Sequence, residues 1–444
     1  MAGVKPSVWT IVVLVGALLG FAFALVSTSD FAAHLDRQVH GIHCSFLPGV
    51  GAPDLSGTSG CHVTLMSPYS SVLQGSVWGG IPISLPALSV FGFIAFWAVA
   101  VWLMGWERNR RATSLLAAAG GLTFVTSLVM AAISFVTLGA ACKLCIGIYV
   151  ASILVFTGAL ALFLNSGRAA TPRLPPQMGG TSVRAHAEQP AGAPPPSPLP
   201  LPILGAAVIF GGAAVLVPVL VYAAAAPDYS GFAGTCGTLD QPNAPDTILI
   251  TLGSQDADVR AIEVLDPLCP ACRGFEERLA STGHDDRLAR KVILFPLDST
   301  CNWMVDEAIH PGACAVSEAM LCAGDRAEDV LEWAFDEQED IREAAAADPN
   351  AAKRMIAEEF PDLGRCVGSA NARARLNRSL QWAVANELPV LTPQLYVNDV
   401  RVCDADTDLG LDYTLGVLLE QAEAGTLRPE GSAPRAEGAG GGTR

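Results

Sequence analysis

Long apolar stretches dominate the first half of the sequence. A helix that spans a bilayer needs about 20 mostly apolar residues. Five stretches reach this length, at residues 8–27, 83–106, 113–138, 142–164 and 201–226. Lys5 is the only basic residue before the first stretch and no clean A-x-A cleavage site follows it, so we expect a retained helix rather than a signal peptide. The pattern therefore predicts five membrane-spanning helices.

Arginines indicate the orientation of these helices. Short cytoplasmic loops are enriched in Lys and Arg. The loop before the third stretch and the segment after the fourth carry Arg108, Arg110, Arg111, Arg168, Arg173 and Arg184. The N-terminus is then cytoplasmic, and five crossings place the C-terminal half outside. We expect a multi-pass protein of the cell (inner) membrane whose C-terminal domain is periplasmic or extracytoplasmic.

Charge divides the chain into two halves. Residues 1–226 hold 9 basic and 5 acidic residues, whereas residues 227–444 hold 18 basic and 38 acidic ones. The acidic half repels phosphate, which argues against nucleic acid as a partner. No Asp, Glu, Arg or His falls inside the five apolar stretches, and this argues against an ion or proton pump.

Composition also suggests the domain boundaries. We expect a four-helix membrane domain at residues 1–165, the fifth helix at 201–226 and a soluble domain at 227–427. Residues 166–200 are rich in proline and are expected to form an extended cytoplasmic linker. Residues 428–444 are rich in Gly, Pro and Ala and are expected to be a disordered tail.

The soluble half has an α/β pattern. Residues 259–265 alternate as a strand, and Cys269-Pro-Ala-Cys272 follows just before a helical stretch at 273–280. Strand, CxxC and helix in this order are the redox motif of the thioredoxin fold. The remaining expected elements are a second strand at 291–297, a helical region at 315–386, strands at 394–397 and 400–402 around a turn, and a final helix at 409–424.

Twelve cysteines, including two CxxC motifs, point to thiol chemistry. Cys142-Lys-Leu-Cys145 opens the fourth apolar stretch, as Cys269 and Cys272 open the soluble helix. The N-terminus of a helix stabilises a thiolate there. The alternatives are two small buried side chains for the first motif, and a structural disulfide or half of a zinc site for the second.

Two further cysteines lie in the loop after the first stretch. Cys44 and Cys61 can form a redox-active or structural disulfide. Three histidines lie close to them in sequence, so a metal site is the alternative. Its possible ligands are His40, His43, Cys44, Cys61 and His62.

The membrane half resembles the vitamin K epoxide reductase family. The resemblance covers roughly residues 8–165 and is carried by Cys44, Cys61, Ser67 and the CxxC that opens the fourth helix. It implies a four-helix bundle around a quinone, with Ser67 and Tyr149 at the quinone. Ser67 can also be a helix cap or turn residue, and Tyr149 an interfacial anchor. Animal members that reduce the epoxide carry an asparagine where this sequence has Leu88, so the expected substrate is a quinone, ubiquinone or menaquinone.

Residues 245–425 resemble the DsbA-like branch of thioredoxin-like proteins. That resemblance implies a cis peptide bond before Pro393, close to the CxxC; an ordinary trans proline at a strand start is the alternative. The dipeptide Pro270-Ala271 lacks the histidine found in the strongest oxidants of the branch. We expect the pairs Cys301–Cys314, Cys322–Cys366 and Cys236–Cys403, although connectivity cannot be derived from sequence.

Together these features predict a quinone-dependent thiol–disulfide oxidoreductase with a four-helix membrane bundle, a fifth transmembrane helix and a DsbA-like soluble domain. Secreted or periplasmic proteins with free cysteines are the expected substrates, the lipid bilayer and a membrane quinone the other partners, and no metal is expected. Electrons would pass from Cys269–Cys272 to Cys44–Cys61, then to Cys142–Cys145 and the quinone. Two alternatives stay open: reversed electron flow, with the soluble domain as disulfide reductase or isomerase, and a metal-binding membrane protein.

Overall fold

The protein forms two compact units, which are described one at a time. The computed structural model describes residues 5–38, 40–48, 50, 59–166, 199–254 and 256–427. Unit 1 contains Met1–His34, Val39–Leu65 and Pro82–Ala225, and unit 2 contains Leu35–Gln38, Met66–Ile81 and Ala226–Arg444. Most of the expected linker, residues 167–198, and the expected tail at 428–444 lie outside the described residues.

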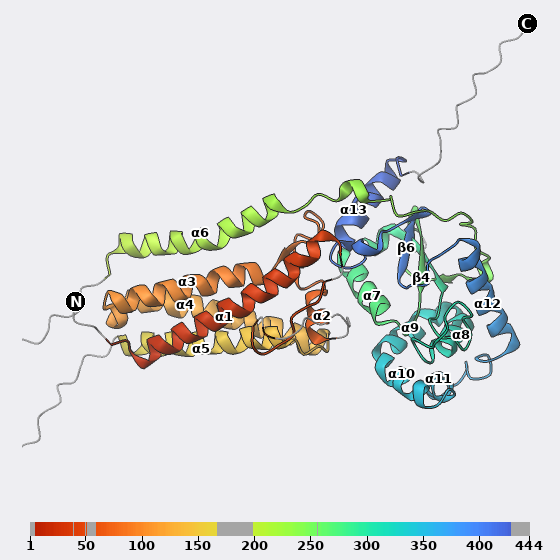
Figure 1. Ribbon diagram of the computed structural model, residues 1–444, viewed down its shortest axis with the longest axis horizontal. Coiled ribbons are helices and arrows are strands. Elements are labelled where there is room, and N and C mark those ends of the chain that lie inside the picture. The colour runs from red at the N-terminus through yellow and green to blue at the C-terminus, as the bar shows by residue number, and fades with distance from the viewer. Residues whose placement is uncertain are drawn as a thin grey trace, which may run out of the picture. The chain divides into compact units, whose positions relative to one another are not determined.

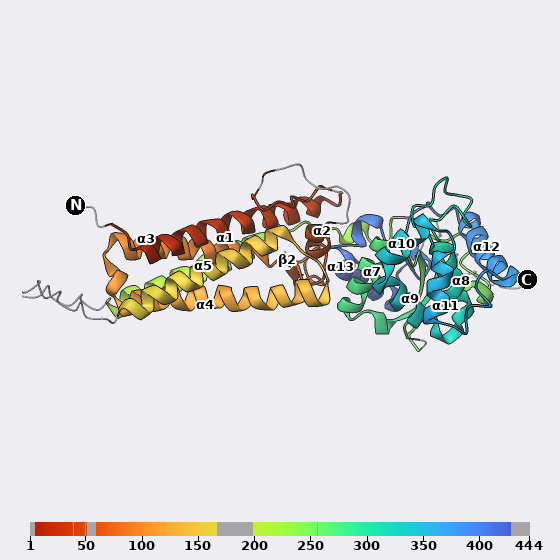
Figure 2. The same ribbon diagram turned by 90° about the horizontal axis from the view of Figure 1, so that it is seen from below.

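Unit 1 is built from long apolar helices. Among the described residues, five helices are long and apolar enough to cross a membrane. They are α1 (Val8–Ala33), α3 (Ser84–Leu103), α4 (Arg110–Ala132), α5 (Lys143–Ser166) and α6 (Leu201–Ala225). Each coincides with one of the predicted apolar stretches. Helices α1, α3, α4 and α5 run side by side as a bundle (Figures 1 and 2).

Small residues allow the bundle helices to approach one another closely. Gly16 of α1 faces the backbone of α5, and a Cβ there would lie 3.0 Å from the Ala151 carbonyl oxygen. Gly158 of α5 lies against Val13 of α1 in the same way. Such contacts between small residues are a common means of helix association in membranes.

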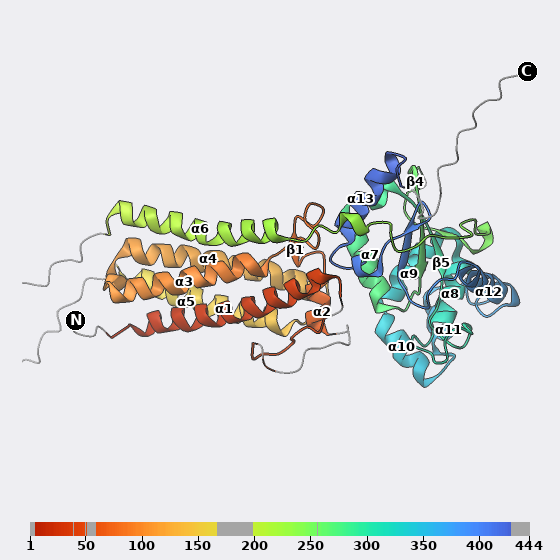
Figure 3. The same cartoon turned by 45° about the horizontal axis from the view of Figure 1, so that its top comes forward.

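Helix α6 packs along the outside of the bundle, next to α3 (Figure 3). Its contact is made by aromatic rings: Phe210 lies 5.2 Å from Phe96 and 6.5 Å from Phe93 between ring centroids. The rest of α6 is largely exposed within the unit, as expected for a helix whose other sides face lipid.

The first helix is longer than its apolar stretch. Residues 28–33 continue the helix after the predicted end at residue 27, and they include Asp30, which is buried. Helix α1 therefore carries a buried carboxylate just beyond the end of the predicted apolar stretch. The physical reason is that Asp30 has partners: it accepts hydrogen bonds from the His43 backbone N–H (2.9 Å) and from His43 Nδ1 (2.7 Å).

Unit 2 contains a mixed sheet. Its strands are β3 (Ile250–Thr251), β4 (Val259–Leu265), β5 (Leu288–Leu294), β6 (Gln394–Val397) and β7 (Val400–Arg401), in the order β3-β5-β4-β6-β7. Strand β4 is parallel to β5 and antiparallel to β6. Asn398 and Asp399 have positive φ and turn β6 into β7, as the sequence predicts.

The second predicted strand of the soluble domain begins three residues earlier than expected. It was expected at residues 291–297, but β5 begins at Leu288, which pairs with Val259 at the start of β4. The bounds of β5 follow from its pairing with the whole length of β4. The Phe295 N–H donates one more hydrogen bond to the Leu265 carbonyl oxygen, and Pro296, which has no N–H, ends the pairing.

Helices cover both faces of this sheet. Helices α7 (Pro270–Thr282) and α13 (Leu411–Glu423) pack on one face, and α12 (Ala370–Ala385) packs on the other. The predicted helical region at 315–386 is divided into α8 (Ala313–Ala323), α9 (Ala327–Asp336), α10 (Gln338–Ala347), α11 (Ala351–Glu359) and α12. Helices α8 to α11 form a helical subdomain whose core reaches the buried Cys272.

Candidate redox site

The soluble CxxC lies where a strand meets a helix. Strand β4 ends at Leu265, and the Cys269 N–H donates a hydrogen bond to the Asp266 carbonyl oxygen (3.1 Å). Cys269 is the N-cap of α7 and Pro270 occupies its first turn. Proline suits this position because its missing N–H would have no partner inside the helix. The Cys269 sulfur thus lies at the positive end of the helix dipole.

The two thiols of this pair lie in different electrostatic environments, and their pKa values differ. All twelve cysteines lie in the described part of the chain, and only Cys269 and Cys272 are free there. A hydrogen bond from Cys272 lowers the pKa of Cys269 to about 6, although burial opposes the shift. Burial raises the pKa of Cys272 well above its ordinary value. Cys269 is therefore the thiolate of the pair near neutral pH, and Cys272 the thiol.

The proline expected near this pair is in place. The Thr392–Pro393 peptide bond is cis, as the sequence predicts. The Cys269 sulfur lies 3.6 Å from the Thr392 carbonyl oxygen. The loop that precedes β6 therefore contacts the CxxC directly.

Buried charged groups in this domain were not predicted from the sequence. Glu263 on β4 is fully buried and bonds Arg290 at 2.6 Å, and its other oxygen has no hydrogen-bond partner among the described residues. Arg290 also bonds Glu276 at 2.7 Å. The only sequence signal was a glutamate among the apolar residues at the end of strand β4. Asp266 is fully buried too and bonds His310, which arrives from a loop far along the chain.

The remaining cysteines of unit 2 form structural disulfides. The structure pairs Cys301 with Cys314, Cys322 with Cys366 and Cys236 with Cys403. All three expected pairs are confirmed. The first closes the loop that carries His310, and the second joins α8 to the segment before α12.

The membrane cysteines form two disulfides in unit 1. Cys44 is bonded to Cys61, which lies on the short helix α2 (Gly60–Leu65), and Cys142 is bonded to Cys145 at the start of α5. Helix α2 contacts α5. A Cβ on Gly60 would lie 2.5 Å from the Ala141 carbonyl oxygen, so this contact is made by backbone. Each of these two residues precedes a cysteine, so the contact brings the two pairs to the same place.

The histidines around the loop disulfide have structural partners. His43 bonds Asp30, and His34 bonds the carbonyl oxygens of Asp30 (2.7 Å) and His40 (3.1 Å). The metal-site alternative drew on Cys44 and Cys61, whose sulfurs are used in a disulfide. In the described part of the chain, no group of three metal-ligating side chains is found.

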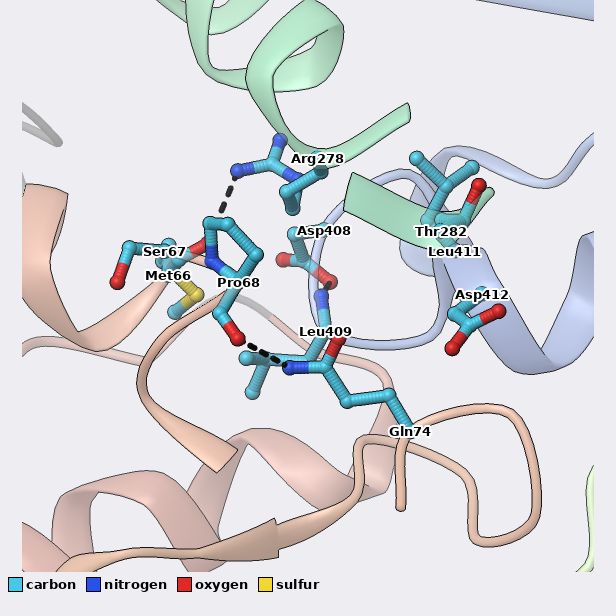
Figure 4. Close-up of a pocket in the computed structure, with 10 residues that line it drawn as sticks. All are labelled: Met66, Ser67, Pro68, Gln74, Arg278, Thr282, Asp408, Leu409, Leu411 and Asp412. Carbon is cyan, nitrogen blue, oxygen red and sulfur yellow. Dashed lines mark hydrogen bonds between the residues drawn. The ribbon is translucent and has the colours of Figure 1, made fainter. Parts of the chain in front are cut away.

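The two predicted quinone contacts fall in different units. Tyr149 is on α5 of unit 1, one turn after Cys145, and its side chain hydrogen-bonds Ser134. Ser67 is buried in unit 2, in the segment Met66–Ile81. There it lines a small pocket together with Arg278, which donates to the Met66 carbonyl oxygen at 3.1 Å (Figure 4).

Segments from the first half of the chain are part of unit 2. Arg37 makes a two-pronged ion pair with the buried Asp406, at 2.9 and 3.0 Å, and Trp78 donates to the same carboxylate at 3.3 Å. Trp78 also packs edge-on against Tyr229 at 5.1 Å between ring centroids. Unit 2 is therefore larger than the predicted 227–427 domain.

Comparison with known families identifies the membrane half. Residues 11–160 match the vitamin K epoxide reductase family. The N-terminal half carries a vitamin K epoxide reductase family domain. This domain spans α1 to α5 and includes both disulfides of unit 1. The resemblance inferred from the cysteine pattern is thereby confirmed.

Several solved structures are similar to the other half of the chain. Reduced DsbA1 from Neisseria meningitidis is 15% identical over 41% of this chain and 97% of its own, with a TM-score of 0.30. The catalytic domain of Proteus mirabilis ScsC is 16% identical, over 39% and 90%, with a TM-score of 0.27. A protein-disulfide isomerase from Novosphingobium aromaticivorans is 17% identical, over 35% and 90%, with a TM-score of 0.27. A comparison with curated proteins finds no match.

The sheet and the CxxC define the fold of unit 2 independently of these likenesses. It is a thioredoxin-like domain with a DsbA-like helical insertion, since α8 to α11 follow β5 and the cis proline precedes β6. A vitamin K epoxide reductase family domain joined to this fold is thiol–disulfide oxidoreductase machinery. Its chemistry is the attack of a thiolate on a disulfide.

Proposed function

We propose that the protein generates disulfides in proteins outside the cytoplasm and passes the electrons to a membrane quinone. Client thiols would reduce the Cys269–Cys272 disulfide. The two electrons would then move to Cys44–Cys61, to Cys142–Cys145 and to the quinone. Each exchange breaks one disulfide and forms another, so two electrons move at every step.

The observation that carries this proposal is the pairing of cysteines at helix starts. Cys269 and Cys142 each stand at the N-terminal end of a helix, and the backbone contact between Gly60 and Ala141 brings the loop disulfide to the second of them. A thiolate at Cys142 is favoured by the dipole of α5 and by the neighbouring Lys143. This order supports attack on Cys61 by Cys142.

Quinone binding is proposed for the interior of unit 1. The bundle is apolar, and the Tyr149 hydroxyl one turn from Cys145 can donate a hydrogen bond to a carbonyl oxygen. When bound, a quinone accepts two electrons and two protons. Ser67, which belongs to unit 2, stays a second predicted contact of the quinone.

Oxidation of a dithiol peptide by the full-length protein in detergent tests the proposal. With quinone present, we expect one disulfide formed and one quinol released per pair of electrons. Cys269→Ser and Cys145→Ser should each abolish quinol formation, whereas Cys322→Ser with Cys366→Ser should retain it. Quinol formation that persists in Cys269→Ser would contradict the role of the soluble pair.

Electron flow in the reverse direction is the alternative. No charged side chain lies between Cys269 and Cys272 to stabilise the reduced form of the pair and so make it an oxidant. The reduction potential of this pair separates the two. A value near about −120 mV favours disulfide formation, and one near about −270 mV favours disulfide reduction.

A further inference from the structure

A buried histidine–carboxylate pair includes Asp266, whose backbone bonds the first cysteine of the soluble CxxC. Nδ1 of His310 lies 2.7 Å from Oδ2 of Asp266. The Asp266 side chain is fully buried and the His310 side chain is 8% exposed. Burying two ionisable groups is costly unless they are paired, so a pair in this position calls for an explanation.

Asp266 is coupled to the CxxC through backbone hydrogen bonds. Its carbonyl oxygen accepts the Cys269 N–H at 3.1 Å, and its Oδ1 accepts the Leu268 N–H at 2.8 Å. Oδ2 also accepts the Leu297 N–H at 2.7 Å. The carboxylate is thus fixed at the turn from which Cys269 begins α7.

His310 is held in place by the loop that carries it. Its backbone N–H donates to the Leu297 carbonyl oxygen at 3.0 Å. The loop is closed by the Cys301–Cys314 disulfide, and Asp298 accepts the Gly312 N–H at 3.0 Å. The imidazole position is therefore determined by a stapled loop.

We infer that His310, held by Asp266, supplies the positive charge that stabilises the Cys269 thiolate, a role that the dipeptide Pro270-Ala271 cannot fill. His310 is a positioning residue that acts through the electrostatics of the pair. The inference deepens the proposed function, because it rests on Cys269 being the attacking thiol. It also makes the reduced form of the pair more stable and the domain a stronger oxidant.

The charges around His310 agree with this role. Burial disfavours the imidazolium, but the hydrogen bond and charge of Asp266 outweigh it and raise the pKa of His310, with Cys269 adding to the effect and Arg342 opposing it. At Cys269 the hydrogen bond from Cys272 lowers the pKa most, burial raises it and Thr392 lowers it; of the buried pair, Asp266 raises this pKa and His310, with the smaller effect, lowers it. The two partners thus act on the thiolate with opposite signs.

The proton balance follows from these charges. A client gives up two electrons and two protons when its two thiols become a disulfide. The enzyme disulfide takes both electrons and one proton, which gives a Cys269 thiolate and a Cys272 thiol, and the second proton goes to solvent. At pH values near the pKa of His310, formation of the Cys269 thiolate also favours binding of a proton by the imidazole.

The test is the rate of Cys269 alkylation against pH in the reduced full-length protein, read at the Cys269 peptide by mass spectrometry. His310→Asn keeps a donor for Asp266 but removes the charge. It should raise the Cys269 pKa by about one unit, slow alkylation at pH 6 about fivefold and make the potential more negative by about 30 mV.

The matched control is another His–carboxylate pair in the same unit. Nε2 of His284 lies 3.0 Å from Asp412, beyond the far end of the 13-residue helix α7, about 19 Å along its axis. His284→Asn should leave the Cys269 pKa unchanged. An unchanged Cys269 pKa in folded His310→Asn would overturn the inference.

The unmodified protein gives a second test should the variants fail to fold. Above the Cys269 pKa, reduction of the Cys269–Cys272 disulfide takes up two electrons and one proton. The reduction potential of the pair therefore falls by about 30 mV per pH unit. Coupling to His310 should steepen this slope over the interval in which His310 titrates. A one-proton slope throughout would overturn the inference, whereas failure of the proposed function would appear separately, as exchange with small thiols that survives Cys269→Ser.

Discussion

At the scale of single residues, the two thiols of the soluble pair differ because their surroundings differ. Cys269 stands at a helix N-terminus beside a hydrogen-bonding partner, and its pKa is lowered to about 6. Cys272 is fully buried one turn later, and burial raises its pKa. The position of the CxxC before a helix, readable in the sequence, was enough to predict this asymmetry.

The first prediction concerns the pH dependence of Cys269. Its folded-state pKa is depressed, so the thiolate predominates above about pH 6 and is lost as pH falls through that value. Alkylation of Cys269 should therefore be half-maximal near pH 6, while Cys272 should stay unreactive through neutral pH. Equal alkylation of both cysteines at pH 7 would contradict the assignment.

The second prediction separates the roles of the two thiols. Cys269→Ser should abolish disulfide exchange with small thiols. Cys272→Ser should instead accumulate mixed disulfides at Cys269, because the thiol that resolves them is absent. Non-reducing electrophoresis with a labelled peptide measures both outcomes, and equal residual exchange in the two variants would count against these roles.

At the scale of elements, local patterns predicted where helices and strands form, whereas some of their exact bounds depend on contacts with distant segments. The apolar stretches, β4, β6 and the Asn398-Asp399 turn follow from short-range sequence periodicity. The start of β5 depends on pairing with β4, and the extension of α1 depends on the bond between Asp30 and His43. Neither partner is visible in a local window of sequence.

The same limit applies to the redox site. Its cysteines and cis proline could be predicted, because their motifs are contiguous or carried by a family resemblance. The contacts of His310 with Asp266 and of Arg290 with Glu263 join residues far apart in sequence. The quinone contact of Ser67 was expected from the family resemblance, and it stays a prediction.

The third prediction tests the backbone contact between α2 and α5. Gly60→Ala would place a Cβ 2.5 Å from the Ala141 carbonyl oxygen, so α2 must move away from the start of α5. Misplaced reacting groups lose rate steeply, and we expect at least about a tenfold slower oxidation of the peptide with quinone. Exchange at Cys269 should be unchanged. The control is Gly212→Ala on α6, where an added Cβ meets no atom within 4 Å.

The fourth prediction compares two structural disulfides. Replacing Cys301 and Cys314 by serine should cost about 2–4 kcal/mol of stability and also raise the Cys269 pKa, because the loop that holds His310 is loosened. Replacing Cys322 and Cys366 should cost a comparable amount but leave that pKa unchanged. Thermal melting and the alkylation profile measure the two effects, and matching pKa values in the two double variants would contradict the coupling.

At the scale of the whole molecule, the proposal requires the soluble domain to lie on the same side of the membrane as the loop disulfide. The arginines near α4 predict that the loop between α3 and α4 is cytoplasmic. A reporter inserted after Asn109 should then be active only inside the cell, and one inserted after Ala226 only outside. Finding both points on one side would remove the fifth crossing and the tethering of the two redox centres.

Tethering gives the fusion of the two domains a physical purpose. A carrier joined to its oxidant meets it at a high effective concentration instead of by diffusion. In the proposed relay, two helix starts stabilise thiolates, and the disulfides form the path along which two electrons move together.

Trapping of the relay intermediate tests the central claim most directly. In Cys145→Ser, Cys142 can still attack Cys61, but the thiol that would resolve the product is missing. Peptide mapping under non-reducing conditions should find a Cys61–Cys142 disulfide, with Cys44 open to alkylation and no quinol formed. A disulfide between Cys142 and Cys44 would reverse the loop order, and quinol formation without any trapped disulfide would contradict the relay.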